Sequence, residues 1–281
     1  MVEKKKINLG MQQGSMLIEQ AKATLDSWGK TDLYSTGDAI IDEYLGGGYG
    51  RPDGYEVITI FGSTGMNKST MTTSFILEPA RKGAKVAYFA LEDDTKDVVK
   101  RILIQCNMDE DKCREITKNI LFMPENDGYT LDMMAETIEQ IFDKVDIIVI
   151  DPLQFIFEAS IAEKGETEFN RQRLFMRRMN NIMKHTNKTL IIVSHTRKSM
   201  GNGKETGLDR IIGSSAVAQV STKVIEIDRK DGVQGIRLWK TRFTPYRFSG
   251  MPVKLDNMKI RSLYGFEDLP SLRANWEGGN E

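Results

Sequence analysis

Residues 62–69, Gly62-Ser-Thr-Gly-Met-Asn-Lys-Ser69, decide how the rest of the chain is interpreted. They follow a short apolar run, Val57–Phe61, and precede a segment of helical period near 69–82. A glycine-containing turn between a buried strand and a helix directs backbone N–H groups and the positive end of the helix at an anion. The stretch therefore predicts a loop that binds phosphate groups.

The spacing of this loop follows the pattern G-x-x-x-x-G-K-[ST] except at one position, where Asn67 precedes Lys68 in place of glycine. Asparagine tolerates left-handed backbone angles, so the loop can keep its shape, although a side chain here crowds the phosphates and weaker nucleotide binding stays an alternative. Lys68 is expected to reach the β- and γ-phosphates, and the Ser69 hydroxyl to bind Mg²⁺. The expected nucleotide-binding residues are Gly62, Ser63, Thr64, Gly65, Met66, Asn67, Lys68 and Ser69.

Two carboxylates follow later apolar runs. Asp151 comes directly after Ile147–Ile150, and Glu92 after the run that begins at Val86. Ligands of open α/β sheets bind at the carboxyl ends of the strands, so both side chains are expected near the phosphates. We predict that Asp151 helps to bind Mg²⁺ and that Glu92 is the general base that activates water. Asp93 and Asp94 are expected to cap the next helix.

Apolar runs alternate with helical segments over most of the chain, which predicts a parallel sheet covered by helices on both faces. After about Ser221 the pattern changes to antiparallel strands with a turn at Lys230-Asp-Gly232. The predicted fold class is therefore α/β, a mostly parallel sheet with C-terminal antiparallel strands. The expected strands are Val57–Phe61, Val86–Leu91, Ile120–Met123, Ile147–Ile150, Leu190–Val193, Val224–Ile227 and Gly235–Trp239, and the expected helices lie near 69–82, 96–106, 131–142 and 169–186.

Composition excludes several classes of protein. The 281 residues are 40% hydrophobic, which is enough for a full core, and 39 Lys and Arg balance 40 Asp and Glu. No apolar run is long enough to cross a bilayer and no signal-peptide pattern follows the charged N-terminus, so a cytoplasmic protein without membrane contact is expected. Cys106 and Cys113 do not have the spacing of a disulfide framework or a zinc site.

The ordered set of motifs resembles the RecA-like motor domain of DnaB-type replicative ring helicases, and within them the helicase half of phage primase-helicases. The set comprises the phosphate loop, Leu91-Glu92, Ile150-Asp151 and Ser194-His195. The block Gly213-Ser-Ser-Ala-Val-Ala-Gln219 is similar to the family's segment near bound DNA, and Trp239-Lys-Thr-Arg-Phe243 to its Lys-x-Arg finger. The resemblance covers about residues 34–256.

The resemblance implies roles that the residues alone leave open. His195 would sense the γ-phosphate, and Lys240 and Arg242 would act on the nucleotide of a neighbouring subunit, so a homo-oligomeric ring, a hexamer, is expected with ATP or another NTP and Mg²⁺. In such a ring, single-stranded DNA would contact loops that line the central channel. The eight basic residues from Arg171 to Lys198, with no acidic residue among them, fit a contact with the DNA backbone. A separate primase, loader or polymerase is an expected partner. The expected DNA-binding residues are Arg197, Lys198, Lys204, Gly213, Ser214 and Gln219.

We divide the sequence into three parts: residues 1–33, a linker with one assembly helix; residues 34–256, the motor; and residues 257–281, an extension that ends in an unstructured tail after Pro270. An apolar stripe of Met16, Leu17, Ala21 and Leu25 recurs at helical spacing in the first part. It fits equally a neighbouring subunit or the core of its own chain.

Three functions are compatible with this sequence. The leading hypothesis is an NTP-driven helicase that translocates on single-stranded DNA and separates duplexes at a replication fork. A RecA-like recombinase shares the core but forms open filaments, and the finger and the Gly213–Gln219 block match ring helicases better. A low-turnover nucleotide-binding scaffold or loader is consistent with Asn67. The presence of all four residues that hydrolysis needs argues against it: Lys68, Ser69, Glu92 and Asp151.

Overall fold

The computed structural model describes residues 18, 22, 33–51, 54–123, 130–159, 168–184, 186–196, 207–212, 214–242 and 250–278. The chain divides into two compact units, Met1–Asp32 and Leu33–Glu281. In the first unit Ile18 and Lys22 are described, and both are helical and exposed, as the predicted helix requires. The four residues of its apolar stripe lie outside the described residues.

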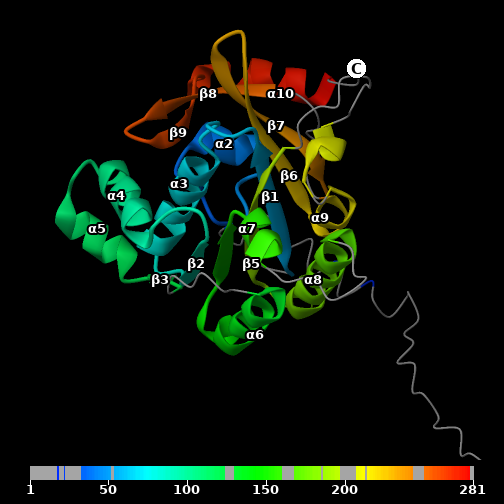
Figure 1. Cartoon of the computed structure of the whole chain (residues 1–281). Coiled ribbons are helices and arrows are strands. Elements are labelled where there is room, and N and C mark those ends of the chain that lie inside the picture. The colour runs from blue at the N-terminus through cyan, green and yellow to red at the C-terminus, as the bar shows by residue number, and fades with distance from the viewer. Residues whose placement is uncertain are drawn as a thin grey trace, which may run out of the picture. The chain divides into compact units, whose positions relative to one another are not determined.

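In the described part of the second unit, nine strands form one sheet in the order β3-β2-β4-β5-β1-β6-β7-β8-β9 (Figure 1). Every pairing from β3 to β6 is parallel and every pairing from β6 to β9 is antiparallel, which confirms the predicted fold class. The strands are β1 (Glu56–Gly62), β2 (Val86–Ala90), β3 (Ile120–Phe122), β4 (Ile147–Asp151), β5 (Thr189–His195), β6 (Lys223–Lys230), β7 (Val233–Thr241), β8 (Gly250–Asp256) and β9 (Lys259–Ser262).

The predicted helices are confirmed with small shifts of their ends, and several short ones are added. Asp94 caps α4 by accepting a hydrogen bond from the Lys96 amide, as expected, whereas Asp93 pairs with Arg101 at 2.7 Å. The added helices α2, α5, α7 and α9 have eight residues or fewer, too few to show a helical period. The helices are α2 (Ala39–Tyr44), α3 (Lys68–Arg81), α4 (Thr95–Gln105), α5 (Glu110–Thr117), α6 (Leu131–Ile141), α7 (Gln154–Ala159), α8 (Glu168–Met183), α9 (Ser214–Val220) and α10 (Leu269–Gly278).

The central part of the sheet is covered on both faces, and alternate residues of β1, β2, β4 and β5 enter different cores. In β1, Ile58 and Ile60 pack with α2, α3 and α4, whereas Val57 and Phe61 pack with α6, α8 and α9. Figure 1 shows α6 and α8 across the sheet from α3. Each described helix is too short or too polar to cross a membrane. The central strands are apolar on both faces because both faces are buried.

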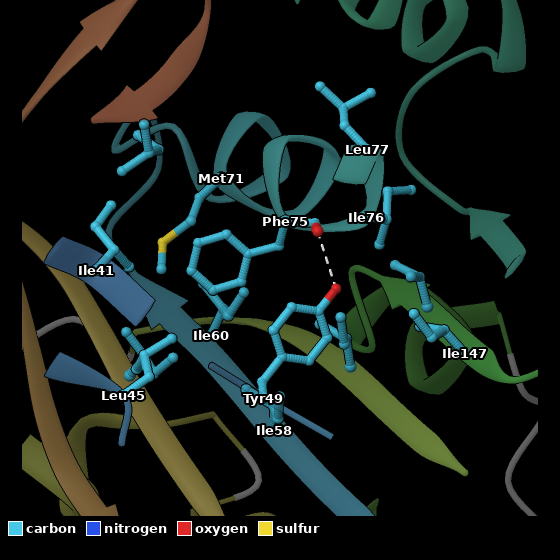
Figure 2. Packing of buried hydrophobic residues seen from close by; sticks show 14 of the residues in the cluster. Ile41, Leu45, Tyr49, Ile58, Ile60, Met71, Phe75, Ile76, Leu77 and Ile147 are labelled. Carbon is cyan, nitrogen blue, oxygen red and sulfur yellow. Dashed lines mark hydrogen bonds between the residues drawn. The ribbon is translucent and has the colours of Figure 1, made fainter. Parts of the chain in front are cut away.

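A proline inside α3 links this helix to the loop before β1. Pro79 has no N–H, so the Phe75 carbonyl one turn earlier loses its usual helical donor. The hydroxyl of the fully buried Tyr49 donates to this carbonyl at 2.9 Å, as Figure 2 shows. Tyr49 also stacks on the Phe75 ring with centroids 5.8 Å apart. The glycine-rich segment before β1 is thereby fixed to the helix that follows the phosphate loop.

The C-terminal residues carry regular structure. β8 and β9 form a hairpin in which Asp256 faces Lys259. The predicted boundary between the motor and the C-terminal extension, after residue 256, therefore falls inside this hairpin. The prediction of an unstructured tail after Pro270 is wrong up to Gly278, because α10 continues from Leu269 to that residue. Leu272 of α10 is buried with the α3 side of the core, and this tertiary contact stabilises a helix of weak local periodicity.

Replacing Tyr49 by Phe is expected to lower the free energy of unfolding by about 1–3 kcal/mol, because the buried Phe75 carbonyl is left without a donor. In a Pro79→Ala background the same replacement should cost much less, since the introduced alanine supplies the helical N–H. Denaturant unfolding of the four variants of this cycle measures both values. Tyr264→Phe, at a partly exposed tyrosine, is the control. An equal loss in both backgrounds would contradict the assignment of the Tyr49 hydroxyl.

Candidate functional site

The carboxyl ends of four neighbouring strands bring the predicted catalytic residues together. β2, β4, β5 and β1 are adjacent in the sheet and parallel, and the register places Gly62 beside His195 and Ala90 beside Asp151. Glu92 follows β2 by two residues. Side chains from four separate parts of the sequence therefore lie along one edge of the sheet, next to the start of α3.

The loop at residues 62–69 depends on two glycines for different reasons. Gly62 ends β1, and a Cβ there would lie 2.2 Å from the Ile227 carbonyl oxygen of β6, so sheet packing excludes a side chain. Gly65 has φ +80°, a conformation that favours glycine. Asn67 adopts φ 63°, ψ 30° and directly precedes α3, which confirms that asparagine takes the left-handed conformation here.

Lys68 lies largely buried at the base of this loop. Its Nζ donates to the Ser63 carbonyl oxygen at 3.1 Å and lies 3.4 Å from His195 Nδ1. Burial lowers the pKa of Lys68, and the nearby Asp151 and Glu92 carboxylates oppose that shift. A partly desolvated ammonium group gains strongly from an incoming polyanion, so Lys68 is suited to bind phosphate oxygens.

Asp151 is buried at the centre of the site and accepts two hydrogen bonds. Ser69 Oγ donates to one carboxylate oxygen at 3.0 Å and the Tyr88 hydroxyl to the other at 2.5 Å. Burial raises the pKa of Asp151 to about 6, although both hydrogen bonds oppose this shift. The Ser69 hydroxyl and the Asp151 carboxylate therefore offer adjacent oxygen ligands to a hard cation.

Within the described residues no three His, Cys, Asp or Glu side chains form a group able to hold a metal ion by themselves. A cation at Ser69 and Asp151 would thus need further oxygen ligands. Mg²⁺ is commonly bound by one or two protein oxygens together with substrate phosphates and waters, and the donor set here fits this arrangement.

Glu92 and His195 face each other over the loop. His195 Nε2 lies 3.5 Å from a Glu92 carboxylate oxygen, and the Glu92 side chain is 44% exposed. The other ring nitrogen of His195 lies 3.4 Å from both Lys68 Nζ and the Thr64 hydroxyl. The geometry thus connects the predicted base to the predicted sensor and the sensor to the phosphate loop.

A second group of predicted residues lies elsewhere on the sheet. Lys240 Nζ donates to the Ala218 and Gln219 carbonyls at 2.6 and 3.2 Å, and Arg242 donates to the Gln219 carbonyl at 3.3 Å. These carbonyls are at the C-terminal end of α9, where cations are favourable. Burial, followed by the charge of Arg242, lowers the pKa of Lys240.

Of the predicted DNA-binding residues, Ser214 begins α9 and Gln219 lies near its end. The others, Arg197, Lys198, Lys204 and Gly213, lie outside the described residues. The described residues that follow position 206 are connected to the sheet through Glu226 of β6. This buried carboxylate accepts hydrogen bonds from Arg210 and from the Trp239 indole, each at 2.6 Å.

The structure adds two residues that the sequence did not indicate. Tyr88 lies inside the apolar strand β2, and its hydroxyl can donate to Asp151 only because β2 pairs with β4. Gln234 of β7 donates to the Met66 carbonyl of the phosphate loop at 2.9 Å. Neither follows a motif, because both act across strands that are distant in sequence.

The model of a family described as an AAA domain matches residues 50–201, more than half of the chain and the whole set from the phosphate loop to His195. The chain belongs to this AAA domain family. The phosphate loop therefore belongs to a P-loop NTPase.

Solved structures share the fold of this AAA domain. One structure, described as an ATPase domain, aligns with a TM-score of 0.70 and 14% identity, covering 90% of this chain and 100% of that one. A DnaB-like replicative helicase, solved in a study of its interactions with primase, aligns with a TM-score of 0.73 and 14% identity over 90% of this chain and 68% of that one. The resemblance to the DnaB-type motor is therefore confirmed at the level of the fold.

A KaiC-like protein from the hyperthermophilic archaeon Pyrococcus horikoshii OT3 has a TM-score of 0.62 and 18% identity, covering 82% of this chain and 98% of that one. No curated protein sequence matches the chain. The fold is thus shared by proteins that differ widely from this chain in sequence.

Asp151→Asn is expected to stabilise the nucleotide-free protein at pH 7.5 by up to about 3 kcal/mol, because burying the charged carboxylate is unfavourable. The folded pKa of about 6 lies above the ordinary value of 3.8, so folding takes up a proton between these pH values. The free energy of unfolding contributed by Asp151 therefore falls as pH rises through this window.

Denaturant unfolding of both proteins at pH 4 and pH 7.5 measures this difference, which should be much smaller at pH 4. Asp256→Asn, at an exposed carboxylate, is the control for the substitution itself and should change the free energy of unfolding by less than about 0.5 kcal/mol. A variant less stable than the wild type at pH 7.5 would contradict the predicted burial penalty.

Proposed function

We propose that this chain is an ATP-driven helicase motor that forms a ring, translocates on single-stranded DNA and separates duplexes at a replication fork. The observation that carries the proposal is the placement of Lys240 and Arg242 away from the phosphate loop of their own chain. A site whose finger residues lie elsewhere on the sheet is completed by a neighbouring subunit.

The strand register fixes this separation. Thr241 faces Lys223, and Lys223 faces Ile58, which lies four positions before Gly62 along β1. Measured along the strand direction at about 3.3 Å per residue, the end of β7 is roughly 13 Å from the start of the phosphate loop, and the two strand spacings between β1 and β7 add to this separation. Lys240 and Arg242 also bind the end of α9 within the chain. The two cations are therefore suited to the nucleotide of the adjacent subunit, which a head-to-tail ring supplies.

The residues at the loop would divide the work of hydrolysis. Lys68 and the loop amides bind the phosphates, and Ser69 with Asp151 hold Mg²⁺, which neutralises phosphate charge when bound. Glu92 orients and deprotonates the attacking water, and His195, within 3.5 Å of Glu92, senses the γ-phosphate. Lys240 and Arg242 of the neighbour stabilise the charge of the transition state.

DNA contacts would come from the side of α9. Arg197, Lys198, Lys204, Gly213, Ser214 and Gln219 are the proposed contacts with the DNA backbone, which suits a motor that ignores base sequence. Gln219 accepts hydrogen bonds from Lys240 and Arg242, so DNA near α9 and the neighbour's nucleotide would share these residues. The solved DnaB-like helicase interacts with primase, and we extend such a partner to this chain as part of the proposal.

Single-stranded DNA is expected to increase ATP hydrolysis by the full chain at least tenfold, and Glu92→Gln should reduce turnover by about 10²-fold or more while nucleotide binding is retained. Steady-state hydrolysis with and without DNA measures this, with Glu110→Gln on exposed α5 as the matched control. Unwinding of a forked duplex separates a helicase from a recombinase. Absence of turnover at every protein concentration would favour the scaffold alternative.

Arg242→Ala should abolish turnover because an arginine finger contributes about 10³ to 10⁵ in rate. Lys68→Ala should also abolish it because the ammonium group that binds the phosphates is lost. An equal mixture of the two variants is expected to recover up to about a quarter of wild-type turnover, since a fraction of interfaces then pairs an intact loop with an intact finger. Arg229→Ala, at an exposed arginine of β6, is the control and should be active alone. A mixture no more active than its components would contradict the action of Arg242 on a neighbouring subunit.

A further inference from the structure

One buried polar side chain of the β6–β7 hairpin contacts the phosphate loop. Gln234, at the start of β7, is 7% exposed. Its Nε2 donates to the Met66 carbonyl at 2.9 Å, and its Oε1 accepts from Asn67 Nδ2 at 3.4 Å. Both ends of this amide are thus used, and both partners belong to the loop that binds phosphate.

Asn67 is the residue that stands where the P-loop pattern has glycine. It is held at φ 63°, ψ 30°, a conformation that costs free energy for any residue with a Cβ. Although Asn67 is the N-cap of α3, its side chain makes no capping hydrogen bond. Its amide group contacts Gln234 instead, so the hairpin stabilises the left-handed conformation from outside the loop.

The contact of Gln234 with the Met66 carbonyl fixes the peptide group that joins Met66 to Asn67. The carbonyl of Met66 and the N–H of Asn67 belong to one planar trans peptide and point in opposite directions. While Gln234 binds that carbonyl, the Asn67 N–H is directed away from Gln234. A rotation of this peptide would turn a carbonyl oxygen, which repels phosphate, to the side that the N–H occupies.

We propose that Gln234 is a positioning residue of the nucleotide site: it holds the Met66–Asn67 peptide and compensates for the missing glycine of the phosphate loop. The inference rests on the nucleotide binding in the proposed function and adds the hairpin to the site. β7 then connects the loop of one subunit, through Gln234, with Lys240 near its other end, which is proposed to act on the next subunit.

The test is the affinity of the full chain for a fluorescent ADP analogue with Mg²⁺. Gln234→Ala is expected to weaken binding about tenfold, which corresponds to loss of a hydrogen-bonded pair. The matched control is Gln105→Ala. Gln105 is also a buried glutamine, but it binds Thr70 and Thr73 of α3 and the Met258 carbonyl, not the loop. Gln105→Ala should lower the Tm and leave the nucleotide affinity within about twofold of wild type.

A second pair of variants separates positioning from general destabilisation. Asn67→Gly removes the backbone cost that Gln234 offsets, so Gln234→Ala in this background should weaken binding by about threefold or less. An equal, about tenfold loss in both backgrounds would overturn the inference, and so would a Gln234→Ala variant that binds nucleotide as the wild type does.

The same measurement separates this inference from the proposed function. A wild-type chain that binds no nucleotide would overturn both. A chain that binds nucleotide but shows no DNA-stimulated hydrolysis would overturn the helicase, while the comparison of Gln234 variants would still decide the role of Gln234.

Discussion

The pairing of β1 with both β5 and β6 positions the phosphate loop and the residues around it. β1 lies inside the sheet and is completely buried, and its last residue, Gly62, starts the phosphate loop. The β6 backbone approaches Gly62 so closely that no Cβ fits. Because β5 pairs with β1 in register, His195 lies beside this glycine. One buried strand thus fixes both the origin of the loop and the neighbour that contacts it.

Burial is unfavourable for two charged side chains of the site, Lys68 and Asp151. It lowers the pKa of Lys68 and raises the pKa of Asp151, and both shifts favour the neutral form of the group. Each shift opposes the charge that the group needs in order to bind phosphate or Mg²⁺. A bound nucleotide with its cation would restore favourable partners to both groups. Their burial therefore lowers the stability of the nucleotide-free protein, and nucleotide binding would relieve this cost.

β7 connects parts of the molecule that the sequence places in separate motifs. Its first residues contact the phosphate loop through Gln234, and its last residues carry Lys240 next to α9. In a ring, a strand of this kind would join the nucleotide site of one subunit to that of the next through a rigid, hydrogen-bonded element.

Features that depend on a local pattern could be predicted from the sequence: the phosphate loop, the alternation of buried strands with helices, and Asp151 and Glu92 at strand ends. Each is visible because its signal lies within about ten consecutive residues. Contacts between strands that are distant in sequence could not be predicted and follow from the packing of the folded chain. Tyr88 reaches Asp151 through the pairing of β2 with β4, and Gln234 reaches the loop through that of β6 with β1 and β7. Register between strands depends on the packing of the whole core, and no single segment encodes it.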